Sequence, residues 1–159
     1  LVIKKEGKWN WRDGWRNSEV DIYITMSEIE EISVSGSGTI ESKGTLKTED
    51  LRLAVSGSGD MELNLESEEL DLRISGSGSI NLNGDAREAE AKISGSGRVK
   101  AEDLTVKVFE ASISGSGSCY INVTDEINAN ISGSGSVYYS GTPNRVNSNS
   151  SGSGKIRKM

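Results

Sequence analysis

The sequence has 159 residues, of which 33% are hydrophobic and 26% charged, and its formal net charge is −6. This length suits a single domain, and the low apolar fraction predicts a thin hydrophobic core. The negative charge argues against a nucleic-acid partner, which requires clustered lysines and arginines, and no apolar run is long enough for a transmembrane helix.

The residue types also restrict the chemistry. The chain has no histidine, and its one cysteine is Cys119. Without histidine it lacks the commonest general base, the usual Ser-His-Asp triad and most zinc sites. A single cysteine cannot form a disulfide within the chain. We therefore expect no enzyme activity and no bound metal or cofactor.

Residues 1–19 form a first segment, rich in tryptophan, that contains Trp9, Trp11 and Trp15. The Asp13-Gly14 pair between them predicts a turn. The repeats that begin at residue 20 need a cap, because the open end of a repeat domain exposes its core and an unpaired strand edge. We expect the tryptophans to form that cap. The alternative is that their indole rings contact a glycan or a protein partner.

Residues 20–159 form the second region, which is repetitive. The tetrapeptide Ser-Gly-Ser-Gly occurs seven times, beginning at residues 35, 56, 75, 94, 114, 132 and 151. The spacing between successive starts varies from 18 to 21 residues. A regular period of this size is the sequence signature of a solenoid, in which each repeat packs only on its neighbours.

Hydrophobic and polar residues alternate on both sides of each tetrapeptide. Residues 61–65 read Met-Glu-Leu-Asn-Leu, and residues 70–74 read Leu-Asp-Leu-Arg-Ile. A period of two predicts strands with one buried face. Each unit is thus predicted to be a strand, the tetrapeptide, a second strand and a polar turn such as residues 66–69.

Coiling these units buries equivalent positions on one another in parallel register. The sequence therefore predicts an all-β fold, a parallel β-solenoid of about seven rungs of roughly 19 residues. One predicted buried file contains Val34, Val55, Ile74, Ile93, Ile113 and Ile131, and another contains Ile40, Met61, Ile80, Val99, Cys119, Val137 and Ile156. Ser150 should interrupt the first file at the last rung. The alternative is an antiparallel sandwich, which predicts hairpin turns and no such files.

In the alternation of inward and outward positions, the glycines of the tetrapeptide fall on the same positions as the buried residues. Counting in steps of two from Val55 leads through Gly57 and Gly59 to Met61. We therefore expect both glycines to face inward, at a corner where no side chain fits. By the same argument Gly76 and Gly95 should not accept larger residues.

One outward column carries the candidate binding residues. Lys100, Tyr120, Tyr138 and Arg157 occupy equivalent positions on successive rungs. Two stacked tyrosines flanked by cations predict a cation–π ladder, which could serve as a flat platform for a sugar ring or a partner surface. The alternative is that the ladder only stabilises the final rungs.

The same column begins with Glu41 and Glu62, which should be adjacent carboxylates. They could form a calcium or acid–base site, or they could be a solvated pair of like charges. Other acidic residues, including Glu66 and Asp85, fall in the predicted turns and are typical of solubilising positions.

The repeats resemble a known bacterial family. The residues that carry the resemblance are the seven tetrapeptides with flanks such as residues 32–38, and the closing segments 137–143 and 151–156. From Val20 to Met159 the chain resembles the family described as putative auto-transporter adhesin, head GIN domain, which is found among envelope proteins and lipoproteins of Bacteroidetes. The resemblance implies a right-handed, single-stranded β-helix at a periplasmic or outer-surface location. It supplies no catalytic or binding residues.

These observations favour a non-enzymatic module of the cell envelope with an adhesive or structural role. The alternatives are a glycan-binding module and a pectinase-like enzyme that degrades polysaccharides. The expected partners are a surface glycan, another envelope protein or a second copy of the chain. Export implies a signal or lipoprotein segment before Leu1.

Overall fold

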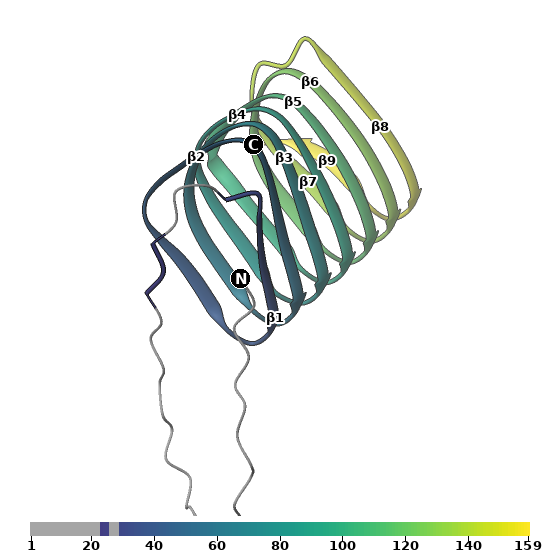
Figure 1. Cartoon of the computed structure of the whole chain (residues 1–159). Helices are drawn as coiled ribbons and strands as arrows, with labels where there is room; N and C mark the ends of the chain where they lie inside the picture. The colour runs from purple at the N-terminus through teal and green to yellow at the C-terminus, as the bar shows by residue number, and fades with distance from the viewer. Residues whose placement is uncertain (1–22, 26–28) are drawn as a thin grey trace, which may run out of the picture.

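The computed structural model describes residues 23–25 and 29–159, and in this part the chain is all-β (Figure 1). The strands are β1 (Glu31–Gly36), β2 (Thr39–Gly57), β3 (Asp60–Gly76), β4 (Ser79–Gly95), β5 (Arg98–Gly115), β6 (Ser118–Gly133), β7 (Ser136–Gly141), β8 (Arg145–Gly152) and β9 (Lys155–Lys158). They follow one another in the order β1-β2-β3-β4-β5-β6-β7-β9, and β8 pairs with β6. All of these pairs are parallel.

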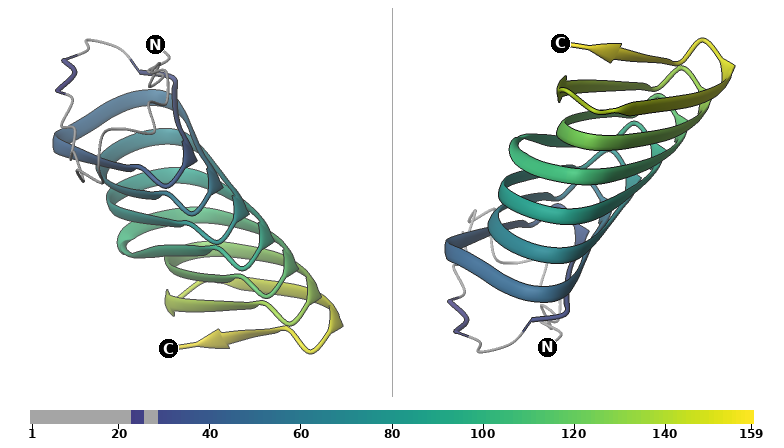
Figure 2. Two further views of the ribbon diagram at one scale, coloured as in Figure 1. Left: turned by 90° about the horizontal axis from the view of Figure 1, so that it is seen from below. Right: turned by 90° about the horizontal axis from the view of Figure 1, so that it is seen from above.

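The strands wind into a β-solenoid of about 7 turns, which are stacked along one axis (Figure 2). Strands β2 to β6 each run most of the way around one turn, whereas β7 and β8 share the next turn. Parallel pairing between sequential turns confirms the predicted solenoid and rules out the antiparallel sandwich.

The predicted polar turns are part of the hydrogen-bonded ladder. Strand β3 continues through residues 66–69, where Glu66 pairs with Asp85 and Glu69 with Glu88 on the next turn. Side chains at these corners point outward, so polar residues can bend the chain while the backbone pairing continues. The ladder is interrupted at the second Ser-Gly of each tetrapeptide instead, and at residues 142–144 between β7 and β8.

Local bulges absorb the variation in repeat length. Glu41 pairs with Glu62, 21 residues later, but Thr45 pairs with Asn64, only 19 residues later. The extra residues between Glu41 and Thr45 form an irregularity at one corner. The register on either side is therefore kept, and the buried columns remain continuous.

The core consists of these columns, and the register of both predicted files is confirmed by the pairing of every successive member. Ile40 and Ile156, at the two ends of the second file, are only partly buried. Ser150 pairs with Ile131 and ends the first file, as expected. Cys119 is fully buried between Val99 and Val137. It therefore takes the place of a small aliphatic residue.

The two glycines of each tetrapeptide have different roles, so the expectation that both face inward is wrong. The first has a positive φ, from +102° at Gly36 to +128° at Gly152, and is not buried. The second is buried in every turn after the first. A Cβ on Gly97 would lie 2.3 Å from Cγ2 of Ile74, so the aliphatic side chain of one turn fills the space left by glycine in the next.

Candidate functional site

A column of outward side chains follows the sheet just after the tetrapeptides. In register it contains Glu41, Glu62, Asn81, Lys100, Tyr120, Tyr138 and Arg157. Parallel strands in register place equivalent side chains one above another. The predicted alignment of Lys100, Tyr120, Tyr138 and Arg157 is therefore confirmed, while their role in binding stays a prediction.

The two tyrosines of this column stack on each other. The ring centroids of Tyr120 and Tyr138 are 4.9 Å apart, and the ring planes differ by 11°. This distance matches the roughly 4.8 Å between neighbouring strands, because each ring extends from its own turn. Each ring covers one face of the other, so a ligand can meet only the ring edges, the outer faces and the phenolic hydroxyls.

Cations lie at both ends of the stack. Lys100 precedes Tyr120 by one turn, and Arg157 follows Tyr138 by one turn. The adjacent outward column has the same arrangement, with hydroxyl side chains between two cations: Arg98, Ser118, Ser136 and Lys155. We call these two columns together, from Arg98 and Lys100 to Lys155 and Arg157, the basic-aromatic face.

The cations do not form the expected cation–π ladder. In the described part of the chain, the cation that lies over an aromatic ring is Lys43, whose Nζ is 4.7 Å from the ring centroid of Tyr23. Lys100 and Arg157 are exposed neighbours of the stack instead. Their charges are therefore available to a ligand.

Most cations elsewhere on the described surface are already paired. These are Lys47, Arg52, Arg73, Arg87, Lys92 and Arg145, each within 4.0 Å of a carboxylate. The four cations of the basic-aromatic face have no such partner among the described residues. In an acidic protein, this face thus gathers four cations that have no carboxylate of the described chain within 4.0 Å.

The acidic end of the column is separate from the aromatic end. Glu41 and Glu62 are adjacent in register, and Asn81 separates them from Lys100. The Oδ1 atom of Asn81 is buried without a hydrogen-bond partner among the described residues. In the same part of the chain, no three His, Cys, Asp or Glu residues are grouped as metal ligands.

The tryptophans Trp9, Trp11 and Trp15 lie outside the described residues. Their role as a cap of the first turn, or as a contact surface, stays a prediction.

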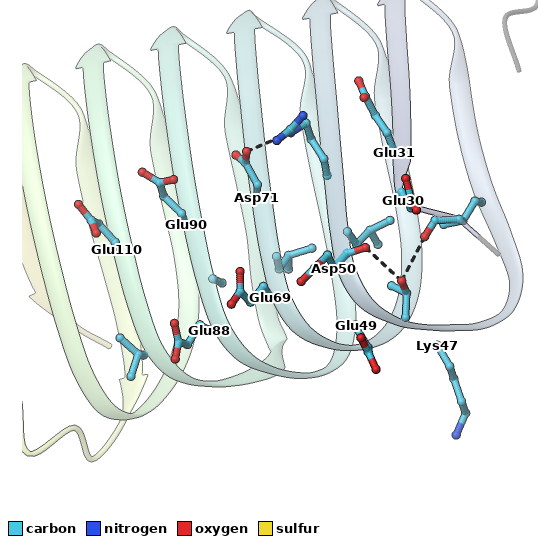
Figure 3. A pocket seen from close by; sticks show the side chains of 17 residues that line it. Glu30, Glu31, Lys47, Glu49, Asp50, Glu69, Asp71, Glu88, Glu90 and Glu110 are labelled. Atoms are coloured by element: carbon cyan, nitrogen blue, oxygen red, sulfur yellow. Dashed lines mark hydrogen bonds and ion pairs between the residues drawn. The ribbon is translucent and has the colours of Figure 1, made fainter.

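Sequence reasoning missed a second surface feature, an acidic hollow of about 1080 Å³ on the side of the rod formed by the strands before the tetrapeptides (Figure 3). Its carboxylates come from two neighbouring outward columns and from the first turns. They are Glu30, Glu31, Glu49, Asp50, Glu69, Asp71, Glu88, Glu90 and Glu110. The sequence pattern could have indicated this feature, because Asp71, Glu90 and Glu110 all occupy outward positions of the alternation and pair in register.

Ion pairs neutralise much of the middle of this hollow. Asp71 receives hydrogen bonds from Arg73 at 2.7 Å and from Arg52 at 3.2 Å. The Arg73 guanidinium, and then Arg52, hold the pKa of the Asp71 carboxyl below its ordinary value despite partial burial. Arg87 pairs with Glu68 and Glu88, and Lys92 pairs with Glu90. These contacts tie neighbouring turns and strand residues together along the rod.

The sequence matches the family described as "Putative auto-transporter adhesin, head GIN domain" over residues 1–143. The match begins at the first residue, so the expectation that the family region starts at Val20 is wrong. It ends before β8, although β8 and β9 continue the solenoid. No curated protein matches the chain.

Similar solved structures come from Bacteroides and Parabacteroides. A putative adhesin from Bacteroides fragilis is 28% identical, with a TM-score of 0.74 over 82% of this chain and 60% of that one. A putative adhesin from Parabacteroides distasonis is 30% identical, with a TM-score of 0.72 over 80% and 58% of the two chains. A putative lipid binding protein from the same species is 28% identical, with a TM-score of 0.69 over 83% and 62%.

The chain thus spans about three fifths of the length of these solved proteins. They share its fold, and the family match extends over most of its sequence. The chain belongs to the family described as putative auto-transporter adhesin, head GIN domain.

Proposed function

We propose that this chain is a non-enzymatic adhesive module of the bacterial cell envelope and that its basic-aromatic face contacts a glycan. The observation that carries the proposal is the stacked pair Tyr120 and Tyr138, partly exposed on a regular sheet face between cations that have no ion-pair partner among the described residues. Rigid aromatic side chains with a polar tip are favoured at contact surfaces, because they supply contact area and a hydrogen bond at low entropic cost.

The stack is also held in place before any ligand arrives. Tyr120 is on β6 and Tyr138 on β7, whose backbones pair from Ser118 to Val123. Behind them, Cys119, Ile121 and Val137 are fully buried in the core. A preorganised surface loses little conformational freedom on binding, which favours affinity.

The electrostatics of Asp71 argue against this carboxyl as the acid of a pectinase-like enzyme. Hydrolysis of a glycosidic bond requires one carboxylic acid whose pKa is raised so that it can protonate the leaving group. The Asp71 carboxyl has the opposite shift, because Arg73 and Arg52 stabilise its charged form. Ion-paired carboxylates of this kind are typical of a structural surface.

The family and its Bacteroidetes relatives support an envelope location, on the periplasmic or outer surface. In the part of the chain that the structure describes, no helix has the length and apolar character to cross a membrane. One of the solved relatives is described as a lipid binding protein, so anionic lipid vesicles belong in any binding test.

The test compares immobilised neutral and acidic envelope polysaccharides for binding to the wild type and to the variant Tyr120→Ser/Tyr138→Ser. The matched control is Asn128→Ser/Asn147→Ser, which removes another outward ladder, joined at 2.8 Å, from the same turns but a different side. We expect saturable binding that falls roughly tenfold in the tyrosine variant and is unchanged in the control. Equal binding by both variants, or release of new reducing ends, would overturn the proposal.

A further inference from the structure

We propose that the ligand of the basic-aromatic face is an acidic polysaccharide, a chain of sugar residues that carry carboxylates, which lies along the axis of the rod. This inference rests on the proposed function and adds the class of ligand and its direction. It follows from the placement, relative to the tyrosine stack, of four cations that form no ion pair within the described part of the chain.

The cations form two pairs, one at each end of the face. Arg98 and Lys100 lie on one turn, and Lys155 and Arg157 lie three turns later in the same two columns. Three strand spacings separate the pairs by about 14 Å. A single small anion cannot reach both pairs, whereas a polymer with charges at intervals can.

Between the two pairs the surface is polar but uncharged. It consists of the stacked rings and of the hydroxyls of Ser118 and Ser136, with Asn122 and Ser140 paired on the adjoining positions. Ring edges contact the apolar faces of sugars, while phenol, serine and amide groups hydrogen-bond to sugar hydroxyls. The pattern thus matches a ligand with charged groups at both ends and neutral sugar surface between them.

The carboxylates at the N-terminal end of the same two columns favour a polysaccharide ligand over a membrane surface. A flat anionic bilayer against this side of the rod would also meet Asp60, Glu41 and Glu62, which continue the two columns toward the N-terminus. Glu102 and Asp103, both exposed, follow Lys100 within the same turn, so a bilayer and a polymer would meet them alike and they do not discriminate between the two. A narrow polymer confined to the last four turns avoids Asp60, Glu41 and Glu62, so the charge distribution selects an extended chain.

The test compares charged polymers with an uncharged polymer of the same sugar backbone. Polygalacturonate carries a carboxylate on each sugar, and its fully methyl-esterified form has the same backbone without the charge. Alginate and hyaluronate extend the acidic set, and vesicles of anionic phospholipid test the membrane. Binding is measured at low and high salt, because exposed charge–charge contacts are screened with a Debye length of about 10 Å at 0.1 M.

We expect the wild type to bind at least one acidic polymer, with affinity that falls as salt rises, and to bind the methyl ester weakly. The variant Arg98→Glu/Lys100→Glu/Lys155→Glu/Arg157→Glu should bind roughly tenfold more weakly, since several exposed ion pairs each contribute a small factor. The control Lys107→Glu reverses an exposed lysine on another part of the surface and should have no effect. Should the quadruple variant fold poorly by circular dichroism, Lys100→Gln/Arg157→Gln replaces it.

The outcomes separate this inference from the proposed function. If the methyl ester binds as well as polygalacturonate, and the tyrosine variant loses both, the glycan-binding function stands and the acidic class is wrong. If no acidic polymer binds, or only lipid vesicles bind, the inference is overturned whatever the neutral glycans do. If acidic polymers bind the quadruple variant as tightly as the wild type, the ligand lies on another surface.

Discussion

A Cβ placed on Gly95 would lie 2.6 Å from the carbonyl oxygen of Gly76, one turn earlier. Gly95 also has a φ of +114°, a backbone conformation that residues with a Cβ rarely adopt. Because each first glycine of the tetrapeptides has this arrangement from the second turn onward, consecutive turns approach closely at this corner.

Replacing Gly95 with alanine should therefore destabilise the protein by on the order of 3 kcal/mol, through backbone strain together with the contact to Gly76. The matched control is Gly44→Ala, because a Cβ at Gly44 meets nothing within 4 Å. Chemical denaturation of the two variants measures the difference. Equal stabilities would show that the corner can relax.

The second glycine of the tetrapeptide should be coupled to the preceding turn. A Cβ on Gly97 meets Ile74 Cγ2 at 2.3 Å and the Gly78 carbonyl oxygen at 3.1 Å. Gly97→Ala should destabilise the wild-type protein. The same substitution should cost less in an Ile74→Ala background, because Ile74→Ala removes the methyl group that the new Cβ would contact. A double-mutant cycle should give a favourable coupling of about 1 kcal/mol or more, and strict additivity would contradict this packing.

The Asp71 ion pairs should make part of the stability depend on pH. The folded pKa of Asp71 is lowered, chiefly by Arg73, so its stabilisation is complete above the ordinary aspartate pKa of about 3.9 and is lost as pH falls through the lower folded value. Asp71→Asn should therefore destabilise near neutral pH and have less effect in acid. Screening limits the difference to less than about 1 kcal/mol.

Denaturation from pH 7 down to pH 2 measures this difference. Asp85→Asn is the control, because Asp85 is exposed and has no ion pair among the described residues. A gap between wild type and Asp71→Asn that grows in acid would contradict the assignment.

Cys119 should behave as a core residue without thiol reactivity. Burial, with a smaller contribution from the Glu102 carboxylate, raises the pKa of its thiol. A thiol reagent at pH 8 should react only after unfolding. Cys119→Val should change the free energy of unfolding by less than about 1 kcal/mol, because valine already occupies the positions before and after it in the column.

The matched variant Cys119→Ser buries a hydroxyl group among aliphatic side chains and should cost about 1–3 kcal/mol. Rapid labelling of the native protein, or equal stabilities of the two variants, would contradict the buried placement.

The sequence predicted the columns better than the corners. The period of two and the repeated tetrapeptide are sufficient to stack Val55 on Ile74 and Tyr120 on Tyr138, because register follows from identity between repeats. The alternation of inward and outward positions could not predict why Gly95 must be glycine, since this depends on its positive φ and on its close approach to Gly76 of the preceding turn. The hollow around Asp71 required the neighbouring columns to be considered together.

The surface charge of the binding face was only partly visible in the sequence. The alignment of Lys100 with Arg157 followed from the repeat. Their lack of carboxylate partners among the described residues required the three-dimensional structure, in which pairing between turns neutralises cations such as Arg52 and Arg145 but not these two. Likewise, the near-parallel stacking of the two tyrosine rings depends on side-chain rotamers, which the sequence does not specify. This stacking makes the inner faces of the rings inaccessible to a ligand.

The most direct test of the binding face is a nuclear magnetic resonance titration of the 15N-labelled chain with a short oligogalacturonate. We predict that the shifted backbone amides belong to the rungs of the basic-aromatic face, around Lys100, Tyr120, Tyr138 and Arg157, and that added salt reverses the shifts. Shifts centred on the acidic hollow around Asp71, or spectra unchanged at saturating oligosaccharide, would contradict the account.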